Sequence, residues 1–91
     1  MSPDFASEIA FKAIGFIVND DTLRDRFLAL SGLSPDEIRA NLAAADFQAS
    51  ILEFLISNEP DLISFAEETG EKPENIVHAW RALGGGVGQE W

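Results

Sequence analysis

Apolar residues recur at helical spacing in six segments of the chain, and no segment shows sustained alternation of apolar and polar positions. Spacings of three to four residues are typical of amphipathic helices, whereas alternation is typical of half-buried strands. Signals that start a helix occur at Ser2, at Asp20 or Asp21, and at Ser34, Asp46, Asn58 and Pro73. We therefore predict an all-α protein with six helices.

The first and fourth of these segments are the most apolar. From Phe5 to Val18 the chain is apolar almost all round, which is typical of a central helix. The fourth segment, with Asp46 as its expected cap, carries four large apolar residues: Phe47, Ile51, Phe54 and Leu55. We expect the first and fourth helices to pack together as the shared core.

The ends of the segments carry the residues that helix ends prefer. Residues 34–37, Ser-Pro-Asp-Glu, form a capping box with proline at the first helical position. Gly32 and Gly70 are suited to the left-handed conformation that ends many helices. Lys72 stands where a capping oxygen is expected, which predicts a weaker start for the sixth helix.

The sequence also repeats itself with a period of 38 residues. The identical pairs are Phe16 and Phe54, Phe27 and Phe65, Gly32 and Gly70, Pro35 and Pro73, and Ile38 and Ile76. A fixed period indicates one structural unit used twice, here two pseudo-repeated three-helix units with approximate twofold symmetry. Because a unit of roughly 40 residues is too small to bury an adequate core, we expect one compact domain over residues 1–83. Residues 84–91 are rich in glycine and are predicted to form a flexible tail.

Charge and composition narrow the classes of partner. Sixteen acidic residues against six basic ones give a net charge of −10, so any charged partner should be basic, and phosphate backbones and anionic membranes should be repelled. The chain contains no cysteine, which excludes disulfides, thiolate zinc sites and thiol nucleophiles. Its start has no basic region, and its apolar runs are shorter than a membrane span requires. We expect a cytoplasmic protein.

Several stretches resemble a known family. They are Phe27-Leu-Ala-Leu-Ser-Gly-Leu-Ser-Pro-Asp-Glu-Ile38, Phe54-Leu-Ile-Ser-Asn58, Phe65, Gly70 and Ala82-Leu83-Gly84-Gly85. Together they resemble a family of small all-helical bacterial domains of unknown function, domain-of-unknown-function family 3572. The resemblance extends nearly to Gly85 and rests on helix caps and core positions. The resemblance implies an all-helical fold and identifies no catalytic residues.

The segment from Phe27 to Leu42 has the spacing of a helix-turn-helix, the element that many DNA-binding proteins use. Its second helix begins with acidic residues and offers one cation, Arg39, where several are needed to neutralise phosphates. The repeated unit adds only His78 and Arg81. A nucleic-acid-binding or regulatory protein of the helix-turn-helix type is therefore the alternative function, and the charge disfavours it.

The remaining charged residues form no known catalytic or metal-binding pattern. Arg24 and Arg26 lie two residues apart and point to different faces, so we expect salt bridges with Asp20, Asp21 or Asp25 rather than an anion site. The acidic clusters over 20–25 and 67–71 lack the spacing of a calcium loop. No serine or glycine-rich run has the setting of a hydrolase nucleophile or a phosphate loop. We predict no catalytic residue, no cofactor and no metal, and hence that the protein is not an enzyme.

Binding to another protein is the function that remains. Trp91 follows the glycine-rich tail, where it can fold back onto the domain, insert into a second copy or anchor a partner. Leu33, Ile56 and Val77 lie off the main apolar stripes, so we expect them to be exposed and to contribute to a contact patch. We predict a small acidic helical module that acts through protein–protein contact, with a basic partner or as a homodimer.

Overall fold

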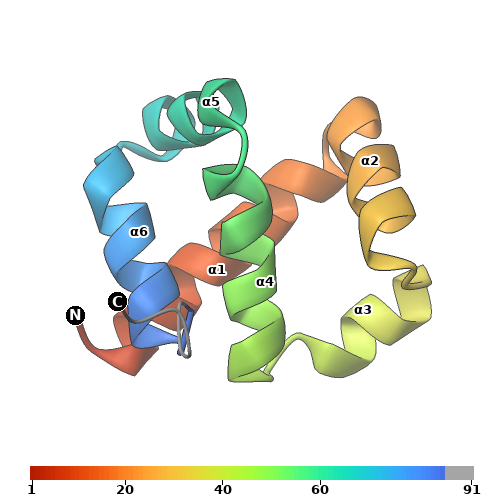
Figure 1. The fold of residues 1–91 in the computed structure, drawn as a ribbon, viewed down its shortest axis with the longest axis horizontal. Coiled ribbons are helices and arrows are strands. Elements are labelled where there is room, and N and C mark those ends of the chain that lie inside the picture. Colours follow the sequence, from red (N-terminus) through yellow and green to blue (C-terminus); the bar gives the residue numbers. More distant parts are fainter. Residues whose placement is uncertain (86–91) are drawn as a thin grey trace, which may run out of the picture.

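A computed structural model describes residues 1–85 and shows them folded into six α-helices without a β-strand (Figure 1). The helices are α1 (Pro3–Val18), α2 (Asp21–Ser31), α3 (Pro35–Asn41), α4 (Ala45–Ile56), α5 (Glu59–Thr69) and α6 (Pro73–Ala82). This arrangement confirms the prediction of an all-α protein. None of these helices is both long enough and apolar enough to cross a membrane.

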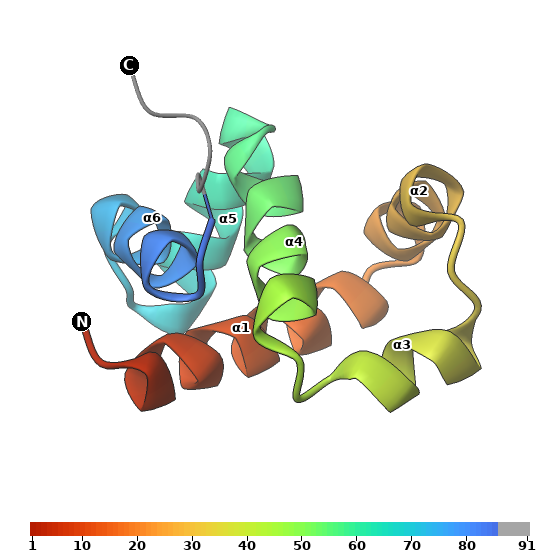
Figure 2. The ribbon, with the colours of Figure 1, turned by 60° about the horizontal axis from the view of Figure 1, so that its bottom comes forward.

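Three helices, α1, α4 and α6, form the centre of the fold, and each packs against the other two. α4 crosses α1, and α6 lies beside α4 over the N-terminal half of α1 (Figures 1 and 2). The predicted packing of the first helix against the fourth is thus present. α5 packs against α4, α6 and α1, whereas α2 packs against α1 on the opposite side from α6 (Figure 2).

Small side chains on α1 allow α4 and α6 to pack against it. Ala6, Ala10 and Ala13 are each 0% exposed, and their spacings of four and three residues place them on one face of the helix. The distance between two packed helices depends on the side chains at the contact, so alanines permit a close approach. Ile9 and Ile17 are buried on the same helix and fill the space beside the alanines.

Larger side chains from the other helices complete the core. The ring of Phe65 is fully buried and lies 5.3 Å from that of Phe16, measured between centroids. The other large, fully buried residues outside α1 are Ile51, Leu52, Leu55 and Ile76. Three of these four lie on α4 and one, Ile76, lies on α6, where Ala79 is also fully buried.

The helix α3 differs from the other five because none of its residues is buried. The predicted capping box is present: the side chain of Ser34 accepts a hydrogen bond from the Glu37 amide at 3.2 Å, and the Glu37 side chain accepts one from the Ser34 amide at 3.1 Å. Ile38 and Leu42 are only half-buried. Since α6, the counterpart of α3 in the sequence repeat, belongs to the core, the predicted twofold symmetry is not confirmed.

Most helix ends follow the predicted signals. Gly32 and Gly70 adopt left-handed conformations, with φ of 70° and 75°, and Lys72 provides no capping hydrogen bond. The expected cap of the fourth helix was wrong, because α4 starts one residue before Asp46 and has Ala44 at its cap position. A backbone turn sets this start, since the Ala44 amide donates to the Asn41 carbonyl oxygen at 2.9 Å.

Candidate functional site

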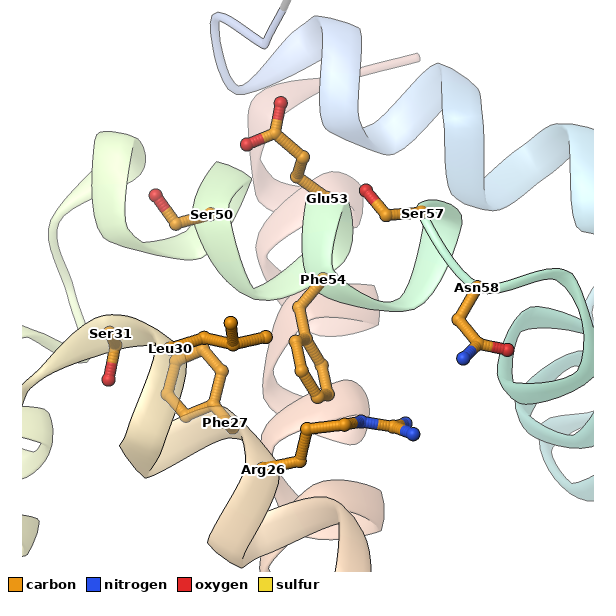
Figure 3. Close-up of a pocket in the computed structure, with 9 residues that line it drawn as sticks. All are labelled: Arg26, Phe27, Leu30, Ser31, Ser50, Glu53, Phe54, Ser57 and Asn58. Atoms are coloured by element: carbon orange, nitrogen blue, oxygen red, sulfur yellow. The ribbon is translucent and has the colours of Figure 1, made fainter.

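An open groove of about 400 Å³ separates α2 from α4 (Figure 3). α2 supplies one wall, and α4 with the turn that follows it supplies the other. The lining residues are Arg26, Phe27, Leu30, Ser31, Ser50, Glu53, Phe54, Ser57 and Asn58. The groove exists because the backbone of α2 packs against α1 and meets α4 only through side chains at the bottom of the groove.

Two phenylalanines, one from each wall, form the floor of this groove. The rings of Phe27 and Phe54 meet edge to face, with 5.2 Å between their centroids. Phe27 also meets Phe47 edge to face at 6.4 Å. Edge-to-face contact is a favourable geometry for aromatic rings. The floor is therefore an apolar surface whose rings hold one another in place.

Leu30 projects from α2 beside this floor and is 73% exposed (Figure 3). It lies one turn after Phe27 on the same stripe of α2, so the helical pattern alone suggests burial. The facing wall offers Phe54 and the small polar Ser50, which leave most of Leu30 uncovered (Figure 3). A large apolar side chain next to an aromatic floor is a feature of protein-binding surfaces.

A second hollow of about 290 Å³ continues the groove toward α3. Its lining residues are Leu33, Asn41, Asp46, Phe47 and Ser50, and Ser50 is shared with the first hollow. We call the residues that line these two hollows the α2/α4 trough. Along α4 the trough extends from Asp46 to Ser57, the residue that caps the C-terminus of the helix, a distance of about 16 Å at 1.5 Å per residue.

The rim of the trough on α4 is polar and acidic. Asp46, Ser50, Glu53 and Ser57 are all exposed, and their spacings of four, three and four residues place them along one edge of the helix. Two of these four side chains are carboxylates. Neither Asp46 nor Glu53 forms a salt bridge with a residue of the described chain.

A salt bridge closes the trough at the end nearest α5. Arg26 of α2 pairs with Asp61 of α5, and its guanidinium group also lies 5.3 Å from the centroid of the Phe54 ring. A guanidinium over an aromatic face is stabilised by the quadrupole of the ring. Because Asp61 neutralises it, Arg26 adds no free positive charge to the lining.

The residues predicted to form a contact patch come from different elements of the fold. Leu33, Ile56 and Val77 are half-buried rather than exposed, and their role as partner contacts stays a prediction. Ile56 packs against the core, because α4 is surrounded by α1, α5 and α6. Val77 lies on α6, which is likewise packed against three helices. Of the three, only Leu33 lines the trough, and Trp91 lies outside the described residues.

The arginines predicted to form salt bridges do so. Arg24 lies 3.3 Å from Asp21 and 3.6 Å from Asp25, as expected from the sequence. Arg26 uses Asp61 instead of a neighbour on its own helix, a contact that sequence spacing could not indicate. Arg39, the cation of the helix-turn-helix segment, pairs with Asp36. The single cation of this segment is therefore already paired with a carboxylate.

Within residues 1–85 no three side chains of the histidine, cysteine, aspartate or glutamate type gather in a way that could hold a metal ion. In the same range, every buried side-chain nitrogen or oxygen has a hydrogen-bond partner. His78, the single histidine of the chain, is exposed on α6. The candidate site in this part of the chain is thus an apolar groove with an acidic rim.

The fold and the trough define a small all-α domain with an aromatic groove between α2 and α4. The chain belongs to the family described as "Protein of unknown function (DUF3572)", whose model matches residues 3–86. No curated protein and no solved structure matches the chain. The resemblance found in the sequence is confirmed, and arguments about function rest on the site itself.

Proposed function

We propose that this protein is a small acidic binding module that acts in the cytoplasm by holding another protein in the α2/α4 trough. The observation that carries the proposal is Leu30, which is 73% exposed beside the floor made by Phe27 and Phe54. Exposed apolar patches that are rimmed by polar residues mark surfaces that bind other proteins. In this protein the acidic rim on α4 supplies the polar residues around Leu30 and the aromatic floor.

The charges of the helix-turn-helix segment favour a protein partner over a nucleic acid. Its second helix, α3, begins with Asp36 and Glu37, and its cation Arg39 is paired with Asp36. Binding to a duplex would require several free cations on this surface. The segment instead serves to carry Leu33 to one end of the trough.

We assign no catalytic step to the protein. The trough contains the carboxylates Asp46 and Glu53 near serines, but the hydroxyl of Ser50 donates to the backbone carbonyl oxygen of Asp46 rather than to a carboxylate. A nucleophilic serine needs a base within hydrogen-bonding reach. Affinity for a partner, rather than a reaction, is therefore the activity to measure.

Site-specific photo-crosslinking in cells of the native host tests this proposal. A photoreactive amino acid is placed at position 30, and the matched control carries it at Ile63, an exposed apolar residue of α5 (41% exposed) outside the trough. We expect a discrete crosslinked protein from position 30 that is absent from position 63. The same set of products from both positions, or none from position 30, would contradict the proposal.

A further inference from the structure

The shape of the α2/α4 trough limits what can occupy it. The trough lies between two helices and is open along a length of about 16 Å, which matches three turns of a third helix. A helix can lie in such a groove with its apolar face on the floor. Addition of a strand is not available here, because residues 1–85 contain no sheet edge.

The apolar contacts are spaced as a helix requires. Phe47 lies toward one end of the trough, Phe54 toward the other, and the two are seven residues apart on α4. Leu30 and Leu33 supply apolar side chains from the opposite wall. An occupant with apolar residues at positions i, i+3 or i+4, and i+7 can contact both ends of the floor at once.

The charge of the rim sets the charge of the occupant. Asp46 and Glu53 lie seven residues apart on the same edge of α4, separated by about 10 Å along its axis. Arg26 is the one cation among the residues that line the trough, and Asp61 already neutralises it. The rim is therefore net negative, as is the chain as a whole. Complementary charge fixes the register of a partner and speeds its association.

We propose that the occupant of the trough is a basic amphipathic helix of about three turns on the partner protein. This inference rests on the proposed function and specifies the kind of segment that the module recognises. The partner helix places its apolar face against Phe27, Phe54 and Leu30. Its lysine or arginine side chains lie beside Asp46 and Glu53.

Binding of designed peptides to the intact protein tests the inference. The probe is a helical peptide of about 14 residues with leucines at i, i+3, i+7 and i+10 and lysines flanking that face. Three comparison peptides are used: one with glutamates in place of the lysines, one with the basic composition scrambled so that no apolar face forms, and one that is proline-rich. Calorimetry at low and at physiological salt measures each affinity.

We expect the basic helical peptide to bind at least about tenfold more tightly than each comparison peptide. Equal binding of the scrambled peptide would show a purely electrostatic contact and would overturn the inference. Equal binding of the acidic peptide, tighter binding of the proline-rich one, or binding of none would also overturn it. If photo-crosslinking at position 30 still captures a partner in that case, the proposed function survives and only the helical occupant fails.

Variants of the protein show whether the peptide binds in the trough. Leu30→Asp should weaken binding by about tenfold, because it places a charge beside the apolar floor. Glu53→Gln should weaken it by about threefold and reduce its salt dependence. Glu67→Gln, an exposed carboxylate on α5, is the matched control and should bind as the unaltered protein does. Circular dichroism confirms that each variant is folded.

Sedimentation of the protein alone tests the competing occupant, a second copy of the chain. We expect a monomer at the concentrations used for the peptide measurements. A dimer that Leu30→Asp converts to a monomer would show that the trough holds another copy, and would overturn the inference of a basic helix. Loss of peptide binding in Leu30→Asp but not in Ile63→Asp would support it.

Discussion

The hydroxyl of Ser7 on α1 donates a hydrogen bond of 2.9 Å to the Oε1 atom of Gln48 on α4. The amide group of Gln48 in turn donates to the carbonyl oxygen of Leu42, at 2.8 Å, in the turn before α4. Gln48 is only 2% exposed and is the polar residue buried within the core of the described chain. One side chain thus connects α1, α4 and the turn after α3.

Replacing Gln48 by leucine should lower the free energy of unfolding by about 1–3 kcal/mol, because the Ser7 hydroxyl and the Leu42 carbonyl oxygen lose their partner. Urea denaturation followed by circular dichroism measures the change. Ser64→Ala, at an exposed position of α5, is the control and should change the free energy by less than about 0.5 kcal/mol. The double variant of Ser7→Ala with Gln48→Leu should cost less than the two single changes added together. An additive result would show that the hydrogen bond contributes nothing.

Ala10→Leu should destabilise the protein by about 1–3 kcal/mol or more, because Ala10 is 0% exposed on the face of α1 that packs into the core. A larger side chain there forces neighbouring helices apart. Ala29→Leu, an exposed position of α2, introduces the same side chain without a steric conflict and is the control. Thermal and urea melts compare the two, and equal midpoints would show that α1 is not closely packed.

The salt bridge between Arg26 and Asp61 should contribute little by itself, because the Arg26 side chain is 38% exposed and solvent screens the pair. A double-mutant cycle with Arg26→Met and Asp61→Asn should give a coupling free energy of about 0.5–1 kcal/mol at low salt. The same cycle in about 1 M salt should give a smaller value. A coupling of zero would mean that packing on Phe54, rather than the pair with Asp61, holds Arg26 in place.

The helix α3 should open without unfolding the rest of the protein, since none of its residues is buried. Hydrogen exchange should therefore find the amides of residues 38–41 less protected than those of α1, α4 and α6. Ser34→Ala removes the capping box and should speed exchange in α3 while costing about 0.5–1 kcal/mol at most in global unfolding. Equal protection across all six helices would contradict this expectation.

Local features of the fold were predictable from the sequence because neighbouring residues determine them. The capping box at Ser34 and the left-handed stops at Gly32 and Gly70 depend on the chemistry of one or two residues. The start of α4 was missed, since the chain uses a backbone turn ending at Ala44 instead of the side chain of Asp46.

The trough was not predictable, because it depends on where α2 lies relative to α4. The pattern placed Leu30 on the apolar stripe of its helix and gave no sign that α4 leaves this side chain uncovered. The available signal was the mixture of polar and apolar residues on α4, since Ser50 and Glu53 line the groove together with Phe54. The burial of Gln48 was missed for the same reason: its partners, Ser7 and Leu42, lie 41 and 6 residues away.

The packing of α1 against α6 makes the first and last helices of the described chain neighbours. During translation, α1 leaves the ribosome long before α6 is made, so the core cannot close until synthesis has passed Ala82. A nascent chain that stops before Pro73 presents uncovered alanines and isoleucines on α1, a surface that chaperones and proteases recognise. We therefore expect chains that end before α6 to be degraded faster than chains that extend through it.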